Sequence, residues 1–338
     1  MDARFREHRP PMDHPERPER LVAIETALFE AQLLRRCHDL PARPVTDEEI
    51  LRAHSRPYLD ALRDRLGQAA ANGTSGYLDP DTYYSPASLV AAELAAGAAV
   101  DLALRVLESG DKDNGLSLCR PPGHHATRDT SMGFCLLNNV AIAAAAAKAR
   151  GARVAIVDFD VHHGNGTEDI FSEDPDVLYI STHQYPLYPG TGPAGFTGRG
   201  RGKGATVNIP LPARSGDQVY LRAFAEIITP VLARFAPDLL LCSAGFDGHA
   251  RDPLAEMALS SASFGAMARS LLAAQPRFAA VLEGGYSLGA LGESVVSFTR
   301  ALLGDAPEAQ TTPDEGESAA VQQEAQATMD KVKRVHGL

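Results

Sequence analysis

The sequence predicts an α/β fold, with a doubly wound and mainly parallel sheet flanked by helices. Short apolar runs that are typical of buried strands recur along the chain, and segments with helical spacing of apolar residues lie between most of them. The segments expected to form strands are residues 116–119, 154–159, 177–182, 239–244 and 278–283. A repeated order of strand and then helix is typical of a parallel sheet.

The helices are expected from apolar spacing, from composition and from helix-start signals. Residues 21–34 have helical spacing, and the acidic residues 47–49 are typical of the first turn of another helix. Residues 88–109 are rich in Ala and Leu and predict a long buried helix, and the alanine-rich residues 138–150 predict a second one. Residues 185–204 are rich in Gly and Pro, so we expect a loop near the strand ends.

The chain is expected to leave the core after Gly304. Residues 305–318 are acidic and contain Pro and Gly, and residues 319–335 can form a peripheral helix. No internal repeat and no second domain are visible. We therefore expect one catalytic domain over residues 1–304, followed by an acidic linker and a C-terminal helix over residues 305–338.

Composition favours an intracellular enzyme. The chain has 338 residues, 44% of them hydrophobic, which suffices for a large core. A formal charge of −11 argues against a nucleic-acid partner, since that would need clustered Lys and Arg. No apolar stretch reaches about 18 residues, and the N-terminus does not resemble a signal peptide, so we expect no membrane partner. The cysteines form no CxxC pair and are expected to be reduced thiols in a cytoplasmic protein; they are Cys37, Cys119, Cys135 and Cys242.

The most informative segment is residues 158–167, DFDVHHGNGT, which directly follows a predicted strand. Residues i and i+2 of an extended chain point to the same face, so Asp160 and His162 can converge on one point, with Asp158 on the same side. Divalent metals bind such oxygen and nitrogen donors, and zinc is the first candidate. The alternative is a solvated polar loop, which we disfavour because crowded ionisable groups are costly without a ligand.

Other chemically suggestive side chains also follow predicted strands. His124 and His125 follow the strand at 116–119, Asp247 follows the strand at 239–244, and Tyr286 follows the strand at 278–283. The active sites of such sheets lie beyond the carboxyl ends of the strands. A tandem histidine alone is more often incidental than catalytic, but packing does not readily explain the whole set.

These residues carry a family resemblance. The ordered segments PPGHHA, GFCLLNN, VDFDVHHGNGT, SAGFDGHARDPL and EGGY resemble the histone deacetylase superfamily, which includes acetylpolyamine amidohydrolases and bacterial deacetylase-like amidohydrolases. The similarity runs from residue 14 to about residue 303, and the opening HPERPERL is similar to class II members. The resemblance implies a single-domain arginase/deacetylase fold. Fewer residues precede HPERP here than is usual in the family, so the first edge strand is expected to be truncated or absent.

The resemblance implies a zinc-dependent amidohydrolase. Asp160, His162 and Asp247 match the zinc ligands and leave coordination open for water and the substrate carbonyl, as in a catalytic zinc site. Iron(II) can occupy the same ligands. Tyr286 matches the tyrosine that hydrogen-bonds the oxyanion, and a Tyr at this position favours a genuine deacetylase. The alternative is a tyrosine that caps a core strand.

The resemblance also assigns the proton-transfer residues. His124 and His125 match the tandem histidines that take a proton from water and deliver one to the leaving amine. Asp158 is the expected partner of His124, and Asn165 that of His125. An acidic partner would raise a histidine's pKa, whereas neutral Asn fixes the tautomer without adding charge. We therefore expect His125 to be the neutral base.

Further residues match the substrate tunnel and the product channel. Gly133 and Phe134 resemble one wall of an acyl-lysine tunnel, and Tyr188 the opposite wall, where the family usually has Phe. Phe134 can alternatively be ordinary core. Leu254 stands where polyamine-selective relatives can have an acid. Arg20 matches an arginine proposed to guide acetate out, with a surface arginine at a helix start as the alternative.

The family also carries structural potassium. One site is matched by main-chain oxygens of Asp158, Asp160 and His162, by the Ser181 hydroxyl and by the Thr182 carbonyl. Part of a second site is matched by carbonyls of Phe171, Asp174 and Val177.

Several functions compete at this point. The first is deacylation of acyl-lysine or similar amines, and the second is the same chemistry on acetylpolyamines; Leu254 favours the first or a promiscuous enzyme. An arginase-like binuclear manganese hydrolase is set aside because the strings after Asp160 and Asp247 lack the bridging carboxylates. A binding module that kept the pocket is disfavoured because no expected ligand or donor is missing. The physiological substrate and the oligomeric state stay open, although residues 185–204 and the tail after Gly304 can form subunit contacts.

Overall fold

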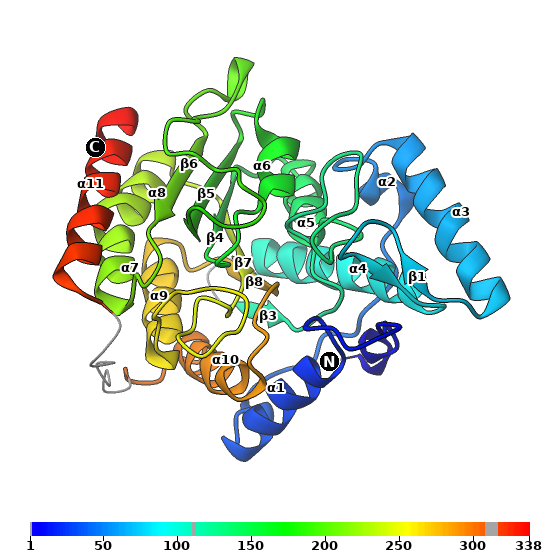
Figure 1. The fold of residues 1–338 in the computed structure, drawn as a ribbon. Coiled ribbons are helices and arrows are strands. Elements are labelled where there is room, and N and C mark those ends of the chain that lie inside the picture. Colours follow the sequence, from blue (N-terminus) through cyan, green and yellow to red (C-terminus); the bar gives the residue numbers. More distant parts are fainter. Residues whose placement is uncertain (1, 110–112, 308–316) are drawn as a thin grey trace.

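A six-stranded sheet forms the centre of the protein (Figure 1). The sequence predicts a mainly parallel sheet and five of its strands, but not the strand at residues 206–211. The computed structural model describes residues 2–109, 113–307 and 317–338. The strand order is β3-β8-β7-β4-β5-β6, and every neighbouring pair is parallel. In this order the strands are β3 Gly115–Ser117, β8 Phe278–Leu282, β7 Leu239–Ala244, β4 Val154–Asp158, β5 Val177–Gln184 and β6 Thr206–Leu211.

The central strand β4 shows why the strands of this sheet are predictable from the sequence. Val154 pairs with Val177 of β5 on one side and with Leu239 of β7 on the other. All five residues of β4 are buried. A parallel strand covered on both faces is apolar throughout, which produces the apolar runs that predict these strands.

The first strand of the sheet differs from its expectation in length. The sequence predicts a strand over residues 116–119, whereas β3 covers Gly115–Ser117 and lies at the edge of the sheet. Residues 2–75 contain no strand. A separate antiparallel hairpin consists of β1 Gly76–Tyr77 and β2 Tyr83–Tyr84.

The helices surround the sheet. They are α1 Glu19–Glu30, α2 Asp47–Ile50, α3 Arg56–Asn72, α4 Ser88–Glu108, α5 Asn139–Lys148, α6 Asn165–Phe171, α7 Asp217–Ala223, α8 Thr229–Phe235, α9 Ser261–Ala274, α10 Leu288–Leu302 and α11 Ala319–His336. Short 3-10 segments are η1 Ala3–Arg6, η2 Leu34–Arg36 and η3 Gly200–Gly202, and a π segment is η4 Phe224–Ile228. No helix among the described residues is long and apolar enough to cross a membrane.

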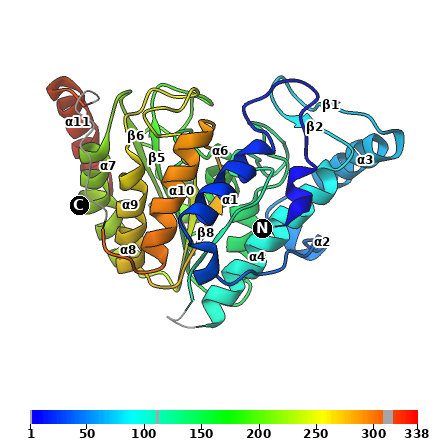
Figure 2. The ribbon, with the colours of Figure 1, turned by 90° about the horizontal axis from the view of Figure 1, so that it is seen from below.

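Two helical layers enclose the sheet (Figure 2). On one face, α4 and α5 pack against each other and contact β7. The alanines of α5 are buried, and their small side chains allow this close packing. On the other face, the rings of Phe264 in α9 and Phe298 in α10 lie 5.9–6.0 Å from the ring of Phe159, which follows β4. Both helix layers therefore hold β4 and the residues after it.

The helix expected to begin at residues 47–49 is short. Thr46 and Glu49 form a capping box, so α2 starts as its acidic residues indicate. It ends at Ile50, and the Ser55 side chain then accepts a hydrogen bond from the Tyr58 backbone N–H to start α3, which was not expected. Ser55 has the extended backbone of an N-cap residue, which separates α3 from α2. The capping box at Thr46 and Glu49 shows where α2 begins but not where it ends.

The C-terminal helix α11 confirms the helix expected over residues 319–335, and it is packed rather than detached. The Ser318 side chain caps it, and Ala325, Met329 and Val332 are buried on its inner face. The helix lies against α7 and against β6 at the outer edge of the sheet (Figure 1). It thereby covers an edge strand that would otherwise be open to pairing.

Candidate metal centre and active site

The candidate site residues gather beyond the carboxyl ends of the strands. Asp160 and His162 follow β4, and Asp247 follows the neighbouring strand β7. The chain runs from β4 outward to β5 and β6 and then returns on the other side of β4 as β7. The cluster therefore stands where the winding direction reverses, the place where doubly wound sheets bind ligands.

The structure brings Asp160, His162 and Asp247 together. Each offers one ligand atom, and these atoms lie within 4.8 Å of one another. Nδ1 of His162 lies 3.2 Å from Oδ1 of Asp160 and 3.1 Å from Oδ2 of Asp247. All three side chains are buried. Two carboxylates and one imidazole converging on a point are a donor set that zinc and iron(II) bind.

The three side chains of this cluster strongly perturb one another's pKa values. Burial and then the neighbouring Asp160 raise the pKa of Asp247 to about 7. Burial alone would lower the pKa of His162, but its hydrogen bonds to the two carboxylates raise it to about 10. Without a positive charge, two buried carboxylates repel each other. A divalent ion held by these three side chains would supply that charge.

Two glycines make room for the carboxylates. A Cβ at Gly245 would lie 2.0 Å from Oδ2 of Asp160, and a Cβ at Gly284 would lie 2.0 Å from Oδ2 of Asp247. Each position therefore excludes any other residue. The backbone N–H of Gly284 also donates to Oδ2 of Asp160 at 2.8 Å. These contacts fit a cradle built to hold an ion.

The tandem histidines lie beside this cluster with the expected partners. Nδ1 of His124 lies 3.0 Å from Oδ2 of Asp158, and Nδ1 of His125 lies 2.8 Å from Oδ1 of Asn165. The ring centroids of His125 and His162 are 6.1 Å apart. Each histidine thus has Nδ1 occupied by its partner and Nε2 available for chemistry.

The two histidines titrate in opposite directions. Burial opposes protonation of His124, but Asp160 and Asp158 raise its pKa to about 10. Burial and then the neighbouring His124 hold the pKa of His125 well below its usual value. The pair therefore combines a cationic imidazole with a neutral one, which separates acid and base roles.

Glu283 is a site residue to which the sequence assigned no role. Its Oε2 accepts hydrogen bonds from the backbone N–H groups of Gly123, at 2.6 Å, and of His124, at 3.1 Å. The Ser243 hydroxyl donates to Oε1 at 3.3 Å. Burial raises the pKa of Glu283 to about 7. A carboxylate at the end of β8 thereby holds the loop that carries the tandem histidines.

Tyr286 also lies beyond the strand ends, against Arg20. The Arg20 guanidinium carbon is 4.9 Å from the centroid of the Tyr286 ring, and Nε of Arg20 donates to the Gly285 carbonyl at 2.7 Å. Burial raises the pKa of Tyr286 well above its usual value, so its hydroxyl keeps the proton that it would donate. Arg20 is fully buried. The alternative of a surface arginine at a helix start is therefore wrong.

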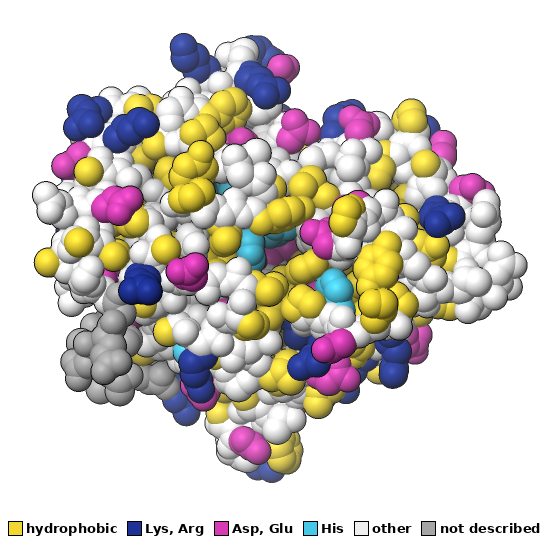
Figure 3. Space-filling view, in the orientation of Figure 1, with side chains coloured by type: hydrophobic (Ala, Val, Ile, Leu, Met, Phe, Trp, Pro, Cys, Tyr) yellow, Lys and Arg dark blue, Asp and Glu magenta, His cyan; other side chains and the backbone are white. Residues whose placement is uncertain are grey.

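Aromatic rings line the entrance to the site. The Tyr188 ring lies edge-on to His125 with centroids 5.2 Å apart, and the Phe134 ring lies edge-on to Tyr286 at 5.9 Å. Phe134 is half-buried rather than enclosed, unlike an ordinary core residue. In Figure 3 histidine and acidic side chains are visible at the bottom of a hollow, with hydrophobic side chains around it.

The backbone of the Phe134 wall is constrained. Phe134 has φ +69°, which is rare for a non-glycine residue and typical of functional segments. A Cβ at Gly133 would lie 2.4 Å from Cδ2 of His125. Only glycine therefore lets this wall approach the histidine. Leu254, expected at the same entrance, is half-buried on the loop after β7.

The residues expected to bind potassium form two groups, one around the end of β4 and its neighbour β5, and one between α6 and β5. Asp158 pairs with Ser181 between β4 and β5, and the Thr182 hydroxyl lies 3.5 Å from the Asp158 carbonyl oxygen. Phe171 ends α6, and the Phe171 carbonyl accepts a hydrogen bond from the Asp174 N–H at 2.9 Å. The first group shares Asp160 and His162 with the candidate metal site. The second group lies between α6 and Val177.

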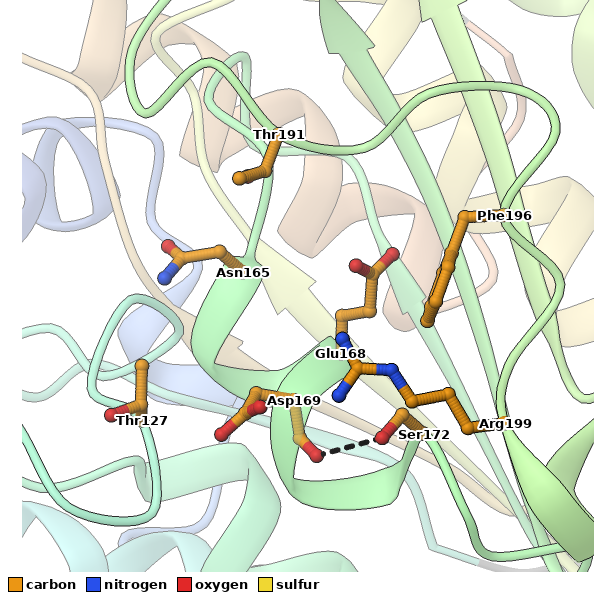
Figure 4. A pocket seen from close by; sticks show the side chains of 8 residues that line it. All are labelled: Thr127, Asn165, Glu168, Asp169, Ser172, Thr191, Phe196 and Arg199. Atoms are coloured by element: carbon orange, nitrogen blue, oxygen red, sulfur yellow. Dashed lines mark hydrogen bonds between the residues drawn. The ribbon is translucent and has the colours of Figure 1, made fainter.

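A cavity of about 390 Å³ lies outside the metal cluster, over α6 (Figure 4). Asn165 lines this cavity and also contacts His125. The side chains around the cavity come from α6 and two loops; they are Thr127, Asn165, Glu168, Asp169, Ser172, Thr191, Phe196 and Arg199.

Comparisons with known proteins find similar sequences and a similar fold. Residues 14–302 match the Histone deacetylase domain family. The chain is 42% identical over 282 residues to the histone deacetylase-like amidohydrolase of Pseudomonas aeruginosa, covering 81% of this chain and 73% of the relative. It is also 42% identical over 301 residues to the polyamine deacetylase HDAC10 of Homo sapiens, covering 86% of this chain but only 45% of that longer relative. The crystal structure of the HDA15 HD domain superposes with a TM-score of 0.90 at 36% identity, covering 99% of this chain and 94% of that one.

Proposed function

The chain belongs to the histone deacetylase family, and on that premise we propose that it is a zinc-dependent amidohydrolase. Its substrates are lysine side chains or related amines that carry an acetyl or other short acyl group, and acetate is released. One observation carries the proposal: Asp160, His162 and Asp247 converge within 4.8 Å beside the paired histidines. Residues 1–304 are proposed as the catalytic unit.

Asp160, His162 and Asp247 would hold the metal. Zinc is the first candidate and iron(II) the second, because both bind this mixture of carboxylate and imidazole. When bound, such an ion polarises an amide carbonyl and lowers the pKa of water. The cradle of Gly245 and Gly284 and the mutual repulsion of the buried carboxylates support this assignment.

His125 is proposed as the general base and His124 as its cationic neighbour. The low pKa of His125, caused by burial and then by His124, keeps its Nε2 free to accept a proton from the attacking water. Its partner Asn165 holds the ring without adding charge. The proton then reaches the leaving amine. His124, hydrogen-bonded to Asp158, contributes positive charge where negative charge develops.

Tyr286 is proposed as the donor to the oxyanion that forms as water adds to the carbonyl. Its hydroxyl keeps its proton in the buried site, and its ring is held by Arg20. A hydrogen bond that strengthens as the oxyanion forms lowers the barrier. Arg20 is further proposed to guide acetate away from the site; its burial beside Tyr286 supports this.

The substrate's alkyl chain is proposed to lie between Phe134 and Tyr188. Their rings approach Tyr286 and His125, so an extended chain between them would present its amide to these residues. Acyl-lysine has an apolar chain of this kind. Leu254 at the gate offers no charge to attract a polyamine, which favours acyl-lysine or promiscuous use.

The second candidate is deacetylation of acetylpolyamines. The 42% identity to human polyamine deacetylase HDAC10 favours it. Both candidates use the same mechanism and differ in the charge that the gate presents to the substrate. Leu254 is therefore the residue on which the choice depends.

Structural potassium is proposed at two groups of residues. Carbonyls of Asp158, Asp160 and His162 with Ser181 and Thr182 would form one site, and the pairing of β4 with β5 places Asp158 beside Ser181. Carbonyls of Phe171, Asp174 and Val177 would form part of the other. A cytoplasmic location is also proposed, supported by four free cysteines.

Comparing kcat/KM for three substrates tests the proposal. The full-length protein with zinc is assayed on an acetyl-lysine peptide, acetylspermidine and acetylputrescine, with acetate release as the readout. We expect the peptide to be favoured by about tenfold or more. The opposite preference would support the polyamine candidate. Binding without hydrolysis of any of the three would support a binding module and contradict the proposal.

A further inference from the structure

The Asp252 carboxylate joins the backbone at Leu254 to the backbone at Tyr286. Its Oδ2 accepts hydrogen bonds from the backbone N–H groups of Tyr286, at 2.6 Å, and of Ser287, at 3.1 Å. Its Oδ1 accepts from the backbone N–H of Leu254 at 3.1 Å. One side chain thus binds two loops that follow different strands, β7 and β8.

Asp252 is held rigidly in this position. Its side chain is buried, and its own N–H donates to the His249 carbonyl at 2.8 Å. Burial raises the pKa of the Asp252 carboxyl, and the N–H groups of Tyr286 and Leu254 act against that rise. A buried carboxylate depends on such donors, so the two loops and the carboxylate stabilise one another.

The segment around Tyr286 is fixed at successive residues. The Gly284 N–H donates to Asp160, and the Gly285 carbonyl accepts from Arg20. Gly285 has φ +116°, a conformation that favours glycine and gives the chain a sharp turn just before Tyr286. Asp252 is the residue that binds the N–H of Tyr286 itself. The direction of the Tyr286 side chain after this turn therefore depends on Asp252.

We propose that Asp252 is a positioning residue that aims the Tyr286 hydroxyl and, through the same carboxylate, sets the Leu254 gate. The inference rests on the function proposed above. Catalytic donors must be held within a fraction of an ångström, and a small displacement is costly in rate. The proposed effect of Asp252 on the rate passes through the position of Tyr286, not through contact with substrate or metal.

A double-mutant cycle with Asp252→Asn and Tyr286→Phe tests this. Asn keeps the shape of Asp252 but replaces one acceptor oxygen with an NH₂ group that cannot accept, so one of the loops loses its contact. With Tyr286 present, we expect Asp252→Asn to lower kcat roughly tenfold. In the Tyr286→Phe background the hydroxyl that Asp252 aims is gone, and we expect a change of less than about twofold.

A purely structural role would give a different pattern. Equal losses of kcat in both backgrounds would overturn the inference while leaving the proposed function intact. If Tyr286→Phe itself kept full kcat, the proposed role of Tyr286 would fail, and the inference with it. The matched control is Asp217→Asn, because Asp217 is also buried and accepts from the Ser260 N–H at 2.8 Å. We expect Asp217→Asn to change the free energy of unfolding, and any change that it causes in kcat to be the same whether residue 286 is Tyr or Phe.

Hydrogen exchange in the unchanged protein covers the case in which Asp252→Asn does not fold. The Tyr286 and Ser287 amides should exchange as slowly as those of β8, since the Asp252 carboxylate binds both. Exchange of these amides as fast as in exposed loops would overturn the inference.

Discussion

Nδ1 of His125 lies 2.8 Å from the amide oxygen of Asn165, whereas the neighbouring His124 faces the carboxylate of Asp158 at 3.0 Å. The two histidines are adjacent in the chain, yet their partners differ in charge. Burial and the proximity of His124 hold the pKa of His125 well below its usual value, and Asn165 leaves this low pKa in place because it is neutral.

Replacing Asn165 with Asp should move the acidic limb of the pH–rate profile to higher pH. The base form of His125 is neutral, so activity is lost as the pH falls through its pKa. A carboxylate at position 165 favours the imidazolium and raises that pKa. The profile of kcat/KM from about pH 5 to about pH 9 measures the shift. The control is Asn114→Asp, because Asn114 directly precedes β3, at the end of the strand away from His124 and His125. An acidic limb that does not move in Asn165→Asp would contradict the base role of His125.

Replacing Tyr286 with Phe should lower kcat by about 10²- to 10³-fold with little change in KM, because only the oxyanion donor is lost. Tyr220→Phe makes the same chemical change at a buried tyrosine whose hydroxyl has no hydrogen-bond partner among the described residues. We expect the control to keep its activity. Steady-state kinetics on one acetyl-lysine peptide decide the matter, and equal effects of both changes would count against the donor role.

Replacing Leu254 with Glu should shift selectivity toward acetylpolyamines. A carboxylate at the gate attracts the second ammonium group of acetylspermidine, which an acetyl-lysine peptide does not present in the same place. We expect the ratio of kcat/KM for acetylspermidine to that for the peptide to rise about tenfold or more. Gln has the shape of Glu but no charge, so Leu254→Gln should leave the ratio near that of the unchanged protein. A similar shift for both variants would show that charge is not the cause.

Buried His8 should make the free energy of unfolding depend on pH. Burial lowers the pKa of His8 to about 3, whereas an unfolded histidine titrates near 6.5. Below about pH 6.5 the unfolded chain therefore binds a proton that the folded chain does not, and stability falls as the pH falls. His8 contributes about 1.4 kcal/mol per pH unit in this range.

Urea unfolding between about pH 7 and about pH 5 measures this contribution. His8→Gln should show a shallower loss of stability than the unchanged protein over that range. Replacing the exposed His38 with Gln is the control and should leave the slope unchanged. An unchanged slope for His8→Gln would contradict the assignment.

Local sequence rules predict that Asp160 and His162 converge because the geometry of this pair is local. Asp160 and His162 are two residues apart just beyond a buried strand, and an extended backbone places such side chains on one face. The third member, Asp247, was placed by its own strand end and by the family motif. The structure brings these three together as expected.

The roles of Glu283 and Asp252 were not predictable because they depend on strand order. Glu283 reaches Gly123 only because β8 lies beside β3, more than a hundred residues away in the chain. Asp252 reaches Tyr286 because β7 and β8 are neighbours. Propensity and periodicity give the strands but not their neighbours, so contacts between a carboxylate and a distant backbone N–H remain hidden.

The helices show the same limit. The capping box at Thr46 and Glu49 started α2 correctly, but the stop after one turn depends on Ser55, which begins α3. Two competing start signals lie within ten residues, and only the packed structure shows that both are used. Element boundaries are for this reason less predictable than element types.

Metal content measured together with hydrolysis tests the central claim most directly. The full-length protein is demetallated with a chelator, reloaded with zinc and compared with Asp247→Ala by elemental analysis and acetyl-lysine hydrolysis. We expect loss of hydrolysis on demetallation, recovery with about one zinc per chain, and neither bound zinc nor recovery in Asp247→Ala. Undiminished hydrolysis by the metal-free protein, or full zinc binding by Asp247→Ala, would contradict the account.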